Sequence, residues 1–294
     1  MDAGDLRVFE AVARLGVMNK AASELNTVQS NVTSRIRRLE EEVGVPLFRR
    51  HTRGVSLTSA GERLLPYALK IARLLGEAKR AVEDDGEPKG LLKIGSLETT
   101  AAYRLPPLIS RYGMTFPAVN ISLKTGTNIR LIEDVLNYEL DGAFVCGPLD
   151  HPELDQTVVF YEELVVATAP GRKRFESMAR TGELKILVKG PGCAYRERFE
   201  EMLLRRGINI NRIEFGTLDA IVGCIAAGLG ETLLPKSVLA PAVKAKRISI
   251  HSLPPADARV ETLFIKRRDA FVSGALAAFL QLARGESKTA QAAE

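Results

Sequence analysis

The spacing of apolar residues changes near residue 90 of this 294-residue chain. Before that point, apolar residues recur every three or four positions, which is typical of helices. Beyond it, short apolar runs alternate with helical stretches, which predicts strands and helices in turn. The segment Gly86-Glu87-Pro88-Lys89-Gly90 lies between the two patterns. Its glycines and proline are typical of a linker, so we place a domain boundary there.

Two helices joined by a tight turn are predicted over residues 19–44. Asn19 and Thr27 are expected to cap them, because short side-chain oxygens accept hydrogen bonds from free backbone N–H groups. Gly44 is a natural stop after the second helix. The apolar residues of that helix form a single stripe, Val32, Ile36, Leu39 and Val43.

The opposite face of the second helix carries polar side chains that suit DNA. Short donors and acceptors can reach base edges in a major groove, and arginines can meet phosphates or bases. An ordinary solvated face is the alternative for an isolated helix. The candidate DNA-binding residues are Gln29, Ser30, Asn31, Thr33, Ser34, Arg35, Arg37 and Arg38.

The neighbouring segments favour the DNA-binding interpretation. An amphipathic helix that contains Phe9 precedes this region and ends near Gly16. Downstream, Arg50 and Arg53 precede a predicted turn residue, Gly54, which leads into a short alternating strand. This order predicts a helix-turn-helix with a two-stranded wing, whose arginines can contact the DNA backbone or minor groove.

A single long helix is predicted from Thr58 to about Asp84. Its apolar residues alternate in spacing between four and three, a heptad seam that is typical of paired helices. Packing of this helix on its own domain is the alternative. We favour a dimer interface, because two DNA-binding modules can then meet two half-sites. The seam residues are Leu64, Ala68, Ile71, Leu75, Ala78 and Val82.

Composition narrows the class of protein. The net charge of +5 favours an anionic partner. Three widely spaced cysteines, Cys146, Cys193 and Cys224, fit a reducing compartment. No apolar run suits a bilayer and no signal peptide is recognisable, so we expect a cytoplasmic protein with no membrane partner. Metal-ligand spacings and enzymatic motifs are missing from the sequence, so we expect no metal, no cofactor and no catalysis.

The first seventy or so residues resemble the winged helix-turn-helix of the bacterial LysR-type transcriptional regulators. One departure is that Ser34 stands where the family usually has arginine, and Arg35 follows it. The resemblance implies binding to double-stranded promoter DNA, a linker-helix homodimer or a homotetramer, and contact with RNA polymerase. The matching positions are Phe9, Gly16, Ala21, Ala22, Leu25, Gln29, Ser30, Val32, Thr33, Ile36, Leu39, Glu40, Gly44, Pro46, Leu47, Phe48, Arg50, Leu57, Thr58, Ala60 and Gly61.

The C-terminal part is predicted to be an α/β domain with mostly parallel sheets. The resemblance implies two Rossmann-like subdomains with a fold like the type 2 periplasmic binding proteins. We expect a DNA-binding domain at 1–58, a dimerisation helix at 59–86 and an effector domain at 87–294. Subdomain I then covers about 91–163 and 264–285, and subdomain II covers about 164–263.

Two loops of this domain are candidates for binding a small molecule. Ser96–Thr100 and Thr125–Asn128 each follow a strand and begin a helix, where backbone N–H groups favour an anion such as a carboxylate. Simple helix capping is the alternative. The resemblance implies an effector cleft lined by these loops and by residues of subdomain II, with Arg196 as the counter-charge. The candidate effector-binding residues are Ser96, Glu98, Thr99, Thr100, Thr127, Asn128, Cys193, Arg196 and Thr217.

Three questions stay open at this stage. Glu98 can repel an anion or select a ligand that carries a hydrogen-bond donor. A DNA-binding repressor that needs no effector, or one that responds to oxidation of a cysteine such as Cys193, is the alternative function. The third question is whether the chain is an enzyme fused to a DNA-binding head, although no nucleophile or acid–base pair supports this function.

Overall fold

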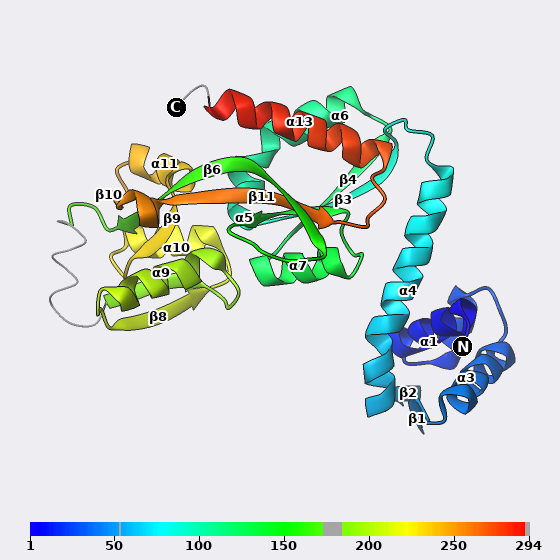
Figure 1. Cartoon of the computed structure of the whole chain (residues 1–294). Coiled ribbons are helices and arrows are strands. Elements are labelled where there is room, and N and C mark those ends of the chain that lie inside the picture. The colour runs from blue at the N-terminus through cyan, green and yellow to red at the C-terminus, as the bar shows by residue number, and fades with distance from the viewer. Residues whose placement is uncertain (53, 173–183, 292–294) are drawn as a thin grey trace. The chain divides into compact units, whose positions relative to one another are not determined.

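The computed structural model describes residues 1–52, 54–172 and 184–291, and the side chains as far as residue 285. The chain forms two compact units, residues 1–84 and 85–294 (Figure 1). Each unit has its own hydrophobic core. We call the first unit the head and the second the C-terminal unit.

The head contains the predicted helix-turn-helix and wing. It consists of α1 (Ala3–Leu15), α2 (Met18–Glu24), α3 (Gln29–Val43), β1 (Phe48–His51), β2 (Gly54–Leu57) and α4 (Ser59–Glu83). Val32, Ile36 and Leu39 of α3 are completely or almost completely buried in one cluster with α1 and α2. Val43, the last residue of the predicted stripe, is partly exposed because α3 ends there.

The two predicted caps of the helix-turn-helix are wrong. Val17 precedes α2 and Val28 precedes α3, and neither supplies a side-chain hydrogen bond. Asn19 is already inside α2. The Thr27 hydroxyl instead accepts a hydrogen bond from the Asn31 side-chain amide at 2.9 Å. Gly44 follows α3 with a φ of 76°, as expected of a helix stop.

Helix α4 divides its apolar seam between two environments. Thr58 caps the helix by accepting a hydrogen bond from the Gly61 backbone at 3.1 Å. Ala68 is fully buried in the head, and Ile71 packs against the same core. Leu75 lies one turn further along and is 51% exposed. Only the second half of the seam is therefore open to a partner within the residues that the structure describes.

The C-terminal unit is built on a seven-stranded sheet in the order β10-β6-β11-β5-β3-β4, with β9 also paired to β6. A separate two-stranded sheet pairs β7 with β8. The strands are β3 (Gly90–Ser96), β4 (Val119–Thr125), β5 (Gly142–Cys146), β6 (Leu154–Thr168), β7 (Leu184–Lys189), β8 (Ile210–Phe215), β9 (Thr232–Pro235), β10 (Ser249–Ser252) and β11 (Arg259–Arg267).

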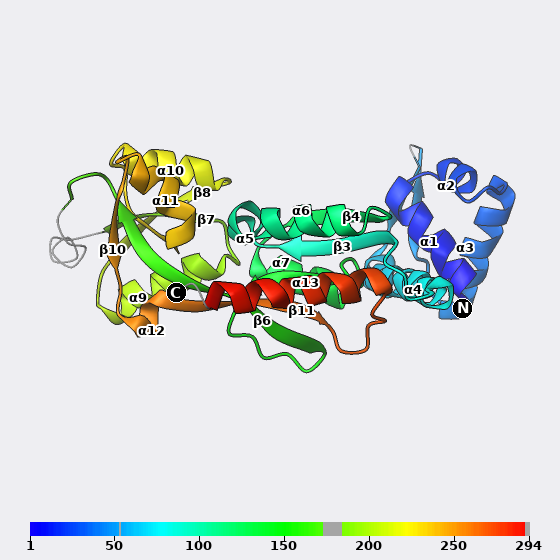
Figure 2. The ribbon, with the colours of Figure 1, turned by 90° about the horizontal axis from the view of Figure 1, so that it is seen from above.

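Two long antiparallel strands join the two halves of this unit. One half contains β3, β4 and β5, and the other contains β7, β8, β9 and β10. Strands β6 and β11 pair along most of their length and run through both halves (Figures 1 and 2). Strand β3 is parallel to β4 and β5, and β7 is parallel to β8. The expectation of mostly parallel sheets is therefore wrong. Strand β6 leaves the first half and β11 returns to it, so each pairs antiparallel with its neighbours in the seven-stranded sheet. The β6 strand starts at Leu154 and ends at Thr168, so it crosses the expected boundary between the subdomains near residue 164.

The helices cover the sheets on both sides. Arg104 separates α5 from α6, and prolines in the first turn of α6 favour a new start there. One core cluster, around Tyr112, Phe144 and Phe279, lies beneath α6 and α13. The helices are α5 (Glu98–Tyr103), α6 (Leu105–Thr115), α7 (Asn128–Leu136), α9 (Ala194–Arg205), α10 (Leu218–Ala226), α11 (Lys236–Lys244), α12 (Pro255–Ala258) and α13 (Gly274–Gln291).

Candidate functional site

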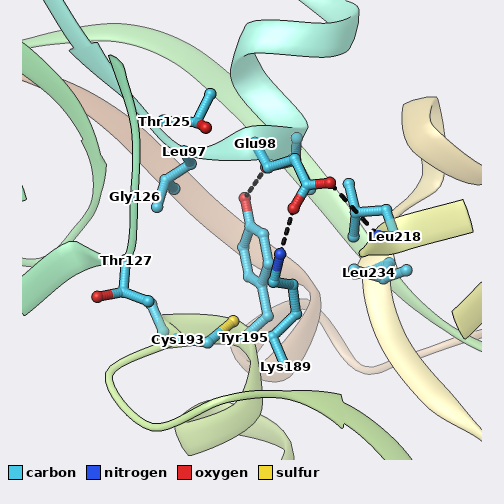
Figure 3. A pocket seen from close by; sticks show the side chains of 12 residues that line it. Leu97, Glu98, Thr125, Gly126, Thr127, Lys189, Cys193, Tyr195, Leu218 and Leu234 are labelled. Atoms are coloured by element: carbon cyan, nitrogen blue, oxygen red, sulfur yellow. Dashed lines mark hydrogen bonds and ion pairs between the residues drawn. The ribbon is translucent and has the colours of Figure 1, made fainter. Parts of the chain in front are cut away.

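A cavity of about 180 Å³ lies between the two halves of the C-terminal unit. Its walls come from the β3–α5 junction and the β4–α7 loop on one side, and from the end of β7 and the starts of α9 and α10 on the other. Figure 3 shows these side chains facing one another across the space. The lining residues are Leu97, Glu98, Thr99, Thr125, Gly126, Thr127, Lys189, Cys193, Ala194, Tyr195, Leu218 and Leu234.

Polar contacts cross this cavity from one half to the other (Figure 3). Glu98 forms an ion pair with the Lys189 ammonium group. Its other carboxylate oxygen accepts a hydrogen bond from the Leu218 backbone N–H, at the start of α10, at 3.4 Å. The hydroxyls of Thr99 and Tyr195 lie 3.5 Å apart. Glu98 and Lys189 are thus the negative and positive groups of the described cavity wall.

The structure brings four of the candidate effector-binding residues to the cavity wall, namely Glu98, Thr99, Thr127 and Cys193. Thr127 also caps α7, because its hydroxyl accepts a hydrogen bond from the Arg130 backbone at 3.4 Å. Capping and lining the cavity are therefore compatible at this position.

Four other candidates make contacts away from the lining. Ser96 is buried and donates to the Leu97 carbonyl at 3.0 Å, and Thr100 is buried within α5. The Asn128 amide binds the Cys146 backbone in both directions, at 2.8 and 2.9 Å. Thr217 caps α10 by accepting a hydrogen bond from the Ala220 backbone. These residues shape the loops rather than the open space.

Lys189, which was not among the candidate residues, lines the cavity, whereas the candidate Arg196 lies outside its wall. The Arg196 guanidinium binds Glu200 at 2.9 Å and Glu214 at 2.8 Å, and it does not line the cavity. Lys189 is the last residue of a parallel strand, and ligands bind beyond the carboxyl ends of such strands. That placement was the signal that could have identified it.

The thiol and phenol of the cavity are held in their neutral forms. Burial raises the pKa of the Cys193 thiol and raises the pKa of Tyr195 well above its usual range. Burial also raises the pKa of Cys146 to about 12. Neutral thiols are poor nucleophiles, so these groups are suited to packing and hydrogen bonding. Within the described residues, no cluster of His, Cys, Asp and Glu could hold a metal ion.

The polar face of α3 is open to solvent at its start and tied to α1 further along. Gln29, Ser30, Asn31 and Ser34 are exposed and Thr33 is partly exposed. The guanidinium of Arg38 binds both oxygens of the buried Asp5, at 2.7 and 2.6 Å, and Arg35 binds the same carboxylate at 3.2 Å.

Arg37 remains 78% exposed beside Glu41. Two of the three candidate arginines of α3 therefore also hold this helix against α1.

The wing presents further cations. Arg50 is exposed on β1, opposite Val55 of β2. Arg53, also a candidate, lies outside the described residues. A Glu40 oxygen accepts hydrogen bonds from the backbones of Leu47 and Phe48, at 2.7 and 3.1 Å, and so ties the end of α3 to the wing. Glu40 is one of the positions that match the family, and this contact gives it a structural role.

Comparisons with known proteins agree with this geometry. Residues 3–62 match the family model of the bacterial regulatory helix-turn-helix protein, lysR family, and residues 85–288 match that of the LysR substrate binding domain. The chain is 46% identical over 281 residues to the uncharacterized HTH-type transcriptional regulator YusT of Bacillus subtilis (strain 168), covering 95% of this chain and 94% of YusT.

It is 42% identical over 276 residues to the HTH-type transcriptional regulator GltR of the same strain, covering 94% of this chain and 93% of GltR. The crystal structure of full-length CbnR complexed with its target DNA has a TM-score of 0.68 to this chain at 24% identity. That match covers 97% of this chain and all of the CbnR chain (100%).

A helix-turn-helix head joined to a two-part ligand-binding unit defines a DNA-binding regulator that responds to an effector, not an enzyme. The chain belongs to the LysR family of transcriptional regulators. Members of this family bind promoter DNA and form oligomers, and their C-terminal domain binds the effector. No helix in the described part of the chain is long and apolar enough to cross a membrane.

Proposed function

We propose that this regulator binds promoter DNA through α3 and the wing and responds to a small carboxylate-bearing effector in the cavity. The observation that carries the proposal is the cavity of about 180 Å³, which has walls from both halves of the C-terminal unit. Lys189 and the N–H group of Leu218 at the start of α10 are suited to hold a carboxylate. Thr99 and Thr127 add hydroxyl groups on the opposite wall.

An effector at this position touches both halves, which are joined by β6 and β11. It can favour one arrangement of the halves only by binding that arrangement more tightly, typically by about 1–3 kcal/mol. We propose that this change alters how paired heads contact the promoter and RNA polymerase in the cytoplasm. The pairing would use the exposed second half of the α4 seam, around Leu75, in a homodimer or homotetramer.

Regulation through cysteine oxidation is the second candidate and has weaker support. Cys193 lines the cavity, but burial raises the pKa of its thiol and disfavours the reactive thiolate. Cys224 is partly buried on α10. An effector-independent repressor would have no use for a cavity that spans both halves.

A thermal-shift screen of the full chain against small aliphatic and aromatic carboxylates tests the effector site. A ligand at a hundred times its dissociation constant stabilises its folded target by about 2.7 kcal/mol, which is readily detected. Each hit is repeated on Thr99→Val, which removes a hydroxyl from the cavity wall. Thr100→Val is the matched control, because Thr100 is buried beside it in α5 and does not line the cavity.

We expect Thr99→Val to reduce the shift and Thr100→Val to preserve it, while both variants bind DNA as the wild type does. An equal loss in both variants would assign the effect to the folding of α5. If no carboxylate stabilises the wild type, the proposed ligand class is wrong.

A further inference from the structure

Glu98 is an unexpected neighbour for a carboxylate ligand. Its two oxygens already occupy Lys189 and the Leu218 N–H, the groups proposed to hold the effector. Glu98 is 36% exposed and Lys189 is 23% exposed, so water reaches their ion pair. A ligand that enters the cavity must therefore compete with a carboxylate that belongs to the protein.

The helix that carries Glu98 is anchored to the sheet. It is the first residue of the short helix α5, and Arg104 follows the last residue of that helix. The Arg104 guanidinium binds both oxygens of Glu162 on β6, at 2.6 and 2.9 Å. Because Glu162 is buried, this pair fixes α5 to one of the two crossing strands.

The charge balance then limits the ligands that fit. An effector with only a negative charge would leave Glu98 without its cation beside the apolar side chains of Leu218 and Leu234. Glu98 is only partly solvated there, so the loss of its cation is unfavourable, although less so than for a fully buried ion pair. A ligand that carries both charges can replace both partners at once.

We propose that the effector is a small zwitterion of the α-amino acid type, an inference that rests on the proposed carboxylate site. Its carboxylate takes the place of Glu98 on Lys189 and the Leu218 N–H, and its ammonium group pairs with Glu98. Its side chain is short and apolar, because the remaining wall includes Leu97, Leu218 and Leu234 and the cavity measures about 180 Å³. The direct ion pair between Glu98 and Lys189 is thus replaced by two ion pairs, one between Lys189 and the ligand carboxylate and one between Glu98 and the ligand ammonium group.

Titration calorimetry of the full chain with three matched sets of probes tests this proposal. The first set is L-alanine, L-valine and L-leucine. The second set contains the same carbon skeletons without the amino group, and the third contains them without the carboxylate. We expect at least one amino acid to bind, and both of its analogues to bind about tenfold more weakly or worse.

The variant Glu98→Gln sharpens the result. It should weaken the amino acid by about tenfold while the matched carboxylate binds as well as before or better, because Lys189 loses its internal competitor. Glu153→Gln, which neutralises an exposed carboxylate outside the cavity, is the control and should change neither affinity.

Two outcomes overturn the inference in different ways. If the carboxylates bind the wild type as tightly as the amino acids, the zwitterion is wrong and the proposed carboxylate site stands. If no probe in any set binds the folded wild type, both proposals are wrong. The analogue series on the wild type decides between these outcomes even if Glu98→Gln does not fold.

Discussion

The head and the C-terminal unit organise their interiors differently. In the head, a single core fixes α3, and Val32, Ile36 and Leu39 are at most 1% exposed. In the C-terminal unit there are two core clusters, which share strands β5, β6 and β11, and a cavity remains between the halves. The comparison indicates that the head presents one fixed surface, while the C-terminal unit keeps the space in which a ligand can favour one arrangement over another.

One buried carboxylate in each unit, Asp5 in the head and Glu231 in the C-terminal unit, differs in how completely it is hydrogen-bonded. Asp5 in the head and Glu231 in the C-terminal unit are each only 1% exposed. Both oxygens of Asp5 accept hydrogen bonds from Arg38. Arg172 binds one oxygen of Glu231 at 3.1 Å, and the other has no partner among the described residues. Both oxygens of Asp5 are thus hydrogen-bonded, as are those of the buried Glu162 in the C-terminal unit, whereas one oxygen of Glu231 is not.

The largest expected effect concerns two neighbouring turns of α4. Ile71→Asp places a charge against the head core and should cost about 2–3 kcal/mol of the head's free energy of unfolding. Leu75→Asp changes a side chain that is 51% exposed, so it should alter that free energy by only about 0.5 kcal/mol. It should nevertheless yield monomers, because a charge then lies in the proposed interface.

Hydrogen exchange of the α1 and α3 amides and analytical ultracentrifugation measure these two properties on the full chain. An intact oligomer in Leu75→Asp would show that the exposed half of the seam is not the interface. Unchanged exchange in Ile71→Asp would show that α4 does not support the head core.

A smaller effect is expected from Glu231 as the pH changes. Burial raises the pKa of this carboxyl group from 4.5 to about 7. Below pH 4.5 the group is protonated in both the folded and the unfolded chain. As the pH rises toward 7, the unfolded chain loses this proton first. Its ionisation favours the unfolded chain, so the free energy of unfolding falls. Between pH 5 and 8 the wild type should lose about 2 kcal/mol more stability than Glu231→Gln.

Urea unfolding of both proteins at the two pH values provides the measurement. Parallel pH profiles would mean that Arg172 fully compensates for the buried charge. A steeper loss in Glu231→Gln would reverse the assigned sign.

Local patterns predicted the head better than the cavity. The stripe of α3 and the stop at Gly44 depend on residues within a few positions of one another. The starts of α2 and α3 were misplaced, because Val17 and Val28 occupy the cap positions without the side-chain hydrogen bonds that make a cap recognisable.

The cavity depends on residues that are distant in the sequence. Glu98 and Lys189 meet only because β6 and β11 bring the two halves together, and no local spacing records that pairing. The position of Arg196 away from the cavity wall has the same origin, since Glu214, which pairs with its guanidinium, lies on β8. Sequence patterns identified the loops of one wall but not the partner that faces them.

The smallest expected effect separates base reading from backbone binding within the head itself. Gln29 is exposed in the first turn of α3 and Arg50 is exposed on the wing. Gln29→Ala should reduce the preference for the operator over unrelated DNA by about 1 kcal/mol, because it removes one contact to a base edge. Arg50→Ala should weaken both DNAs equally and lower the slope of log affinity against log salt by about one unit.

Fluorescence anisotropy with both DNAs over a salt series measures the two quantities together. An equal loss on both DNAs in Gln29→Ala would place that side chain on the phosphate backbone instead of the bases. A loss of preference in Arg50→Ala would assign sequence reading to the wing. Either result would change which part of the head is assigned to base reading and which to backbone binding. Neither would affect the proposed role of the cavity.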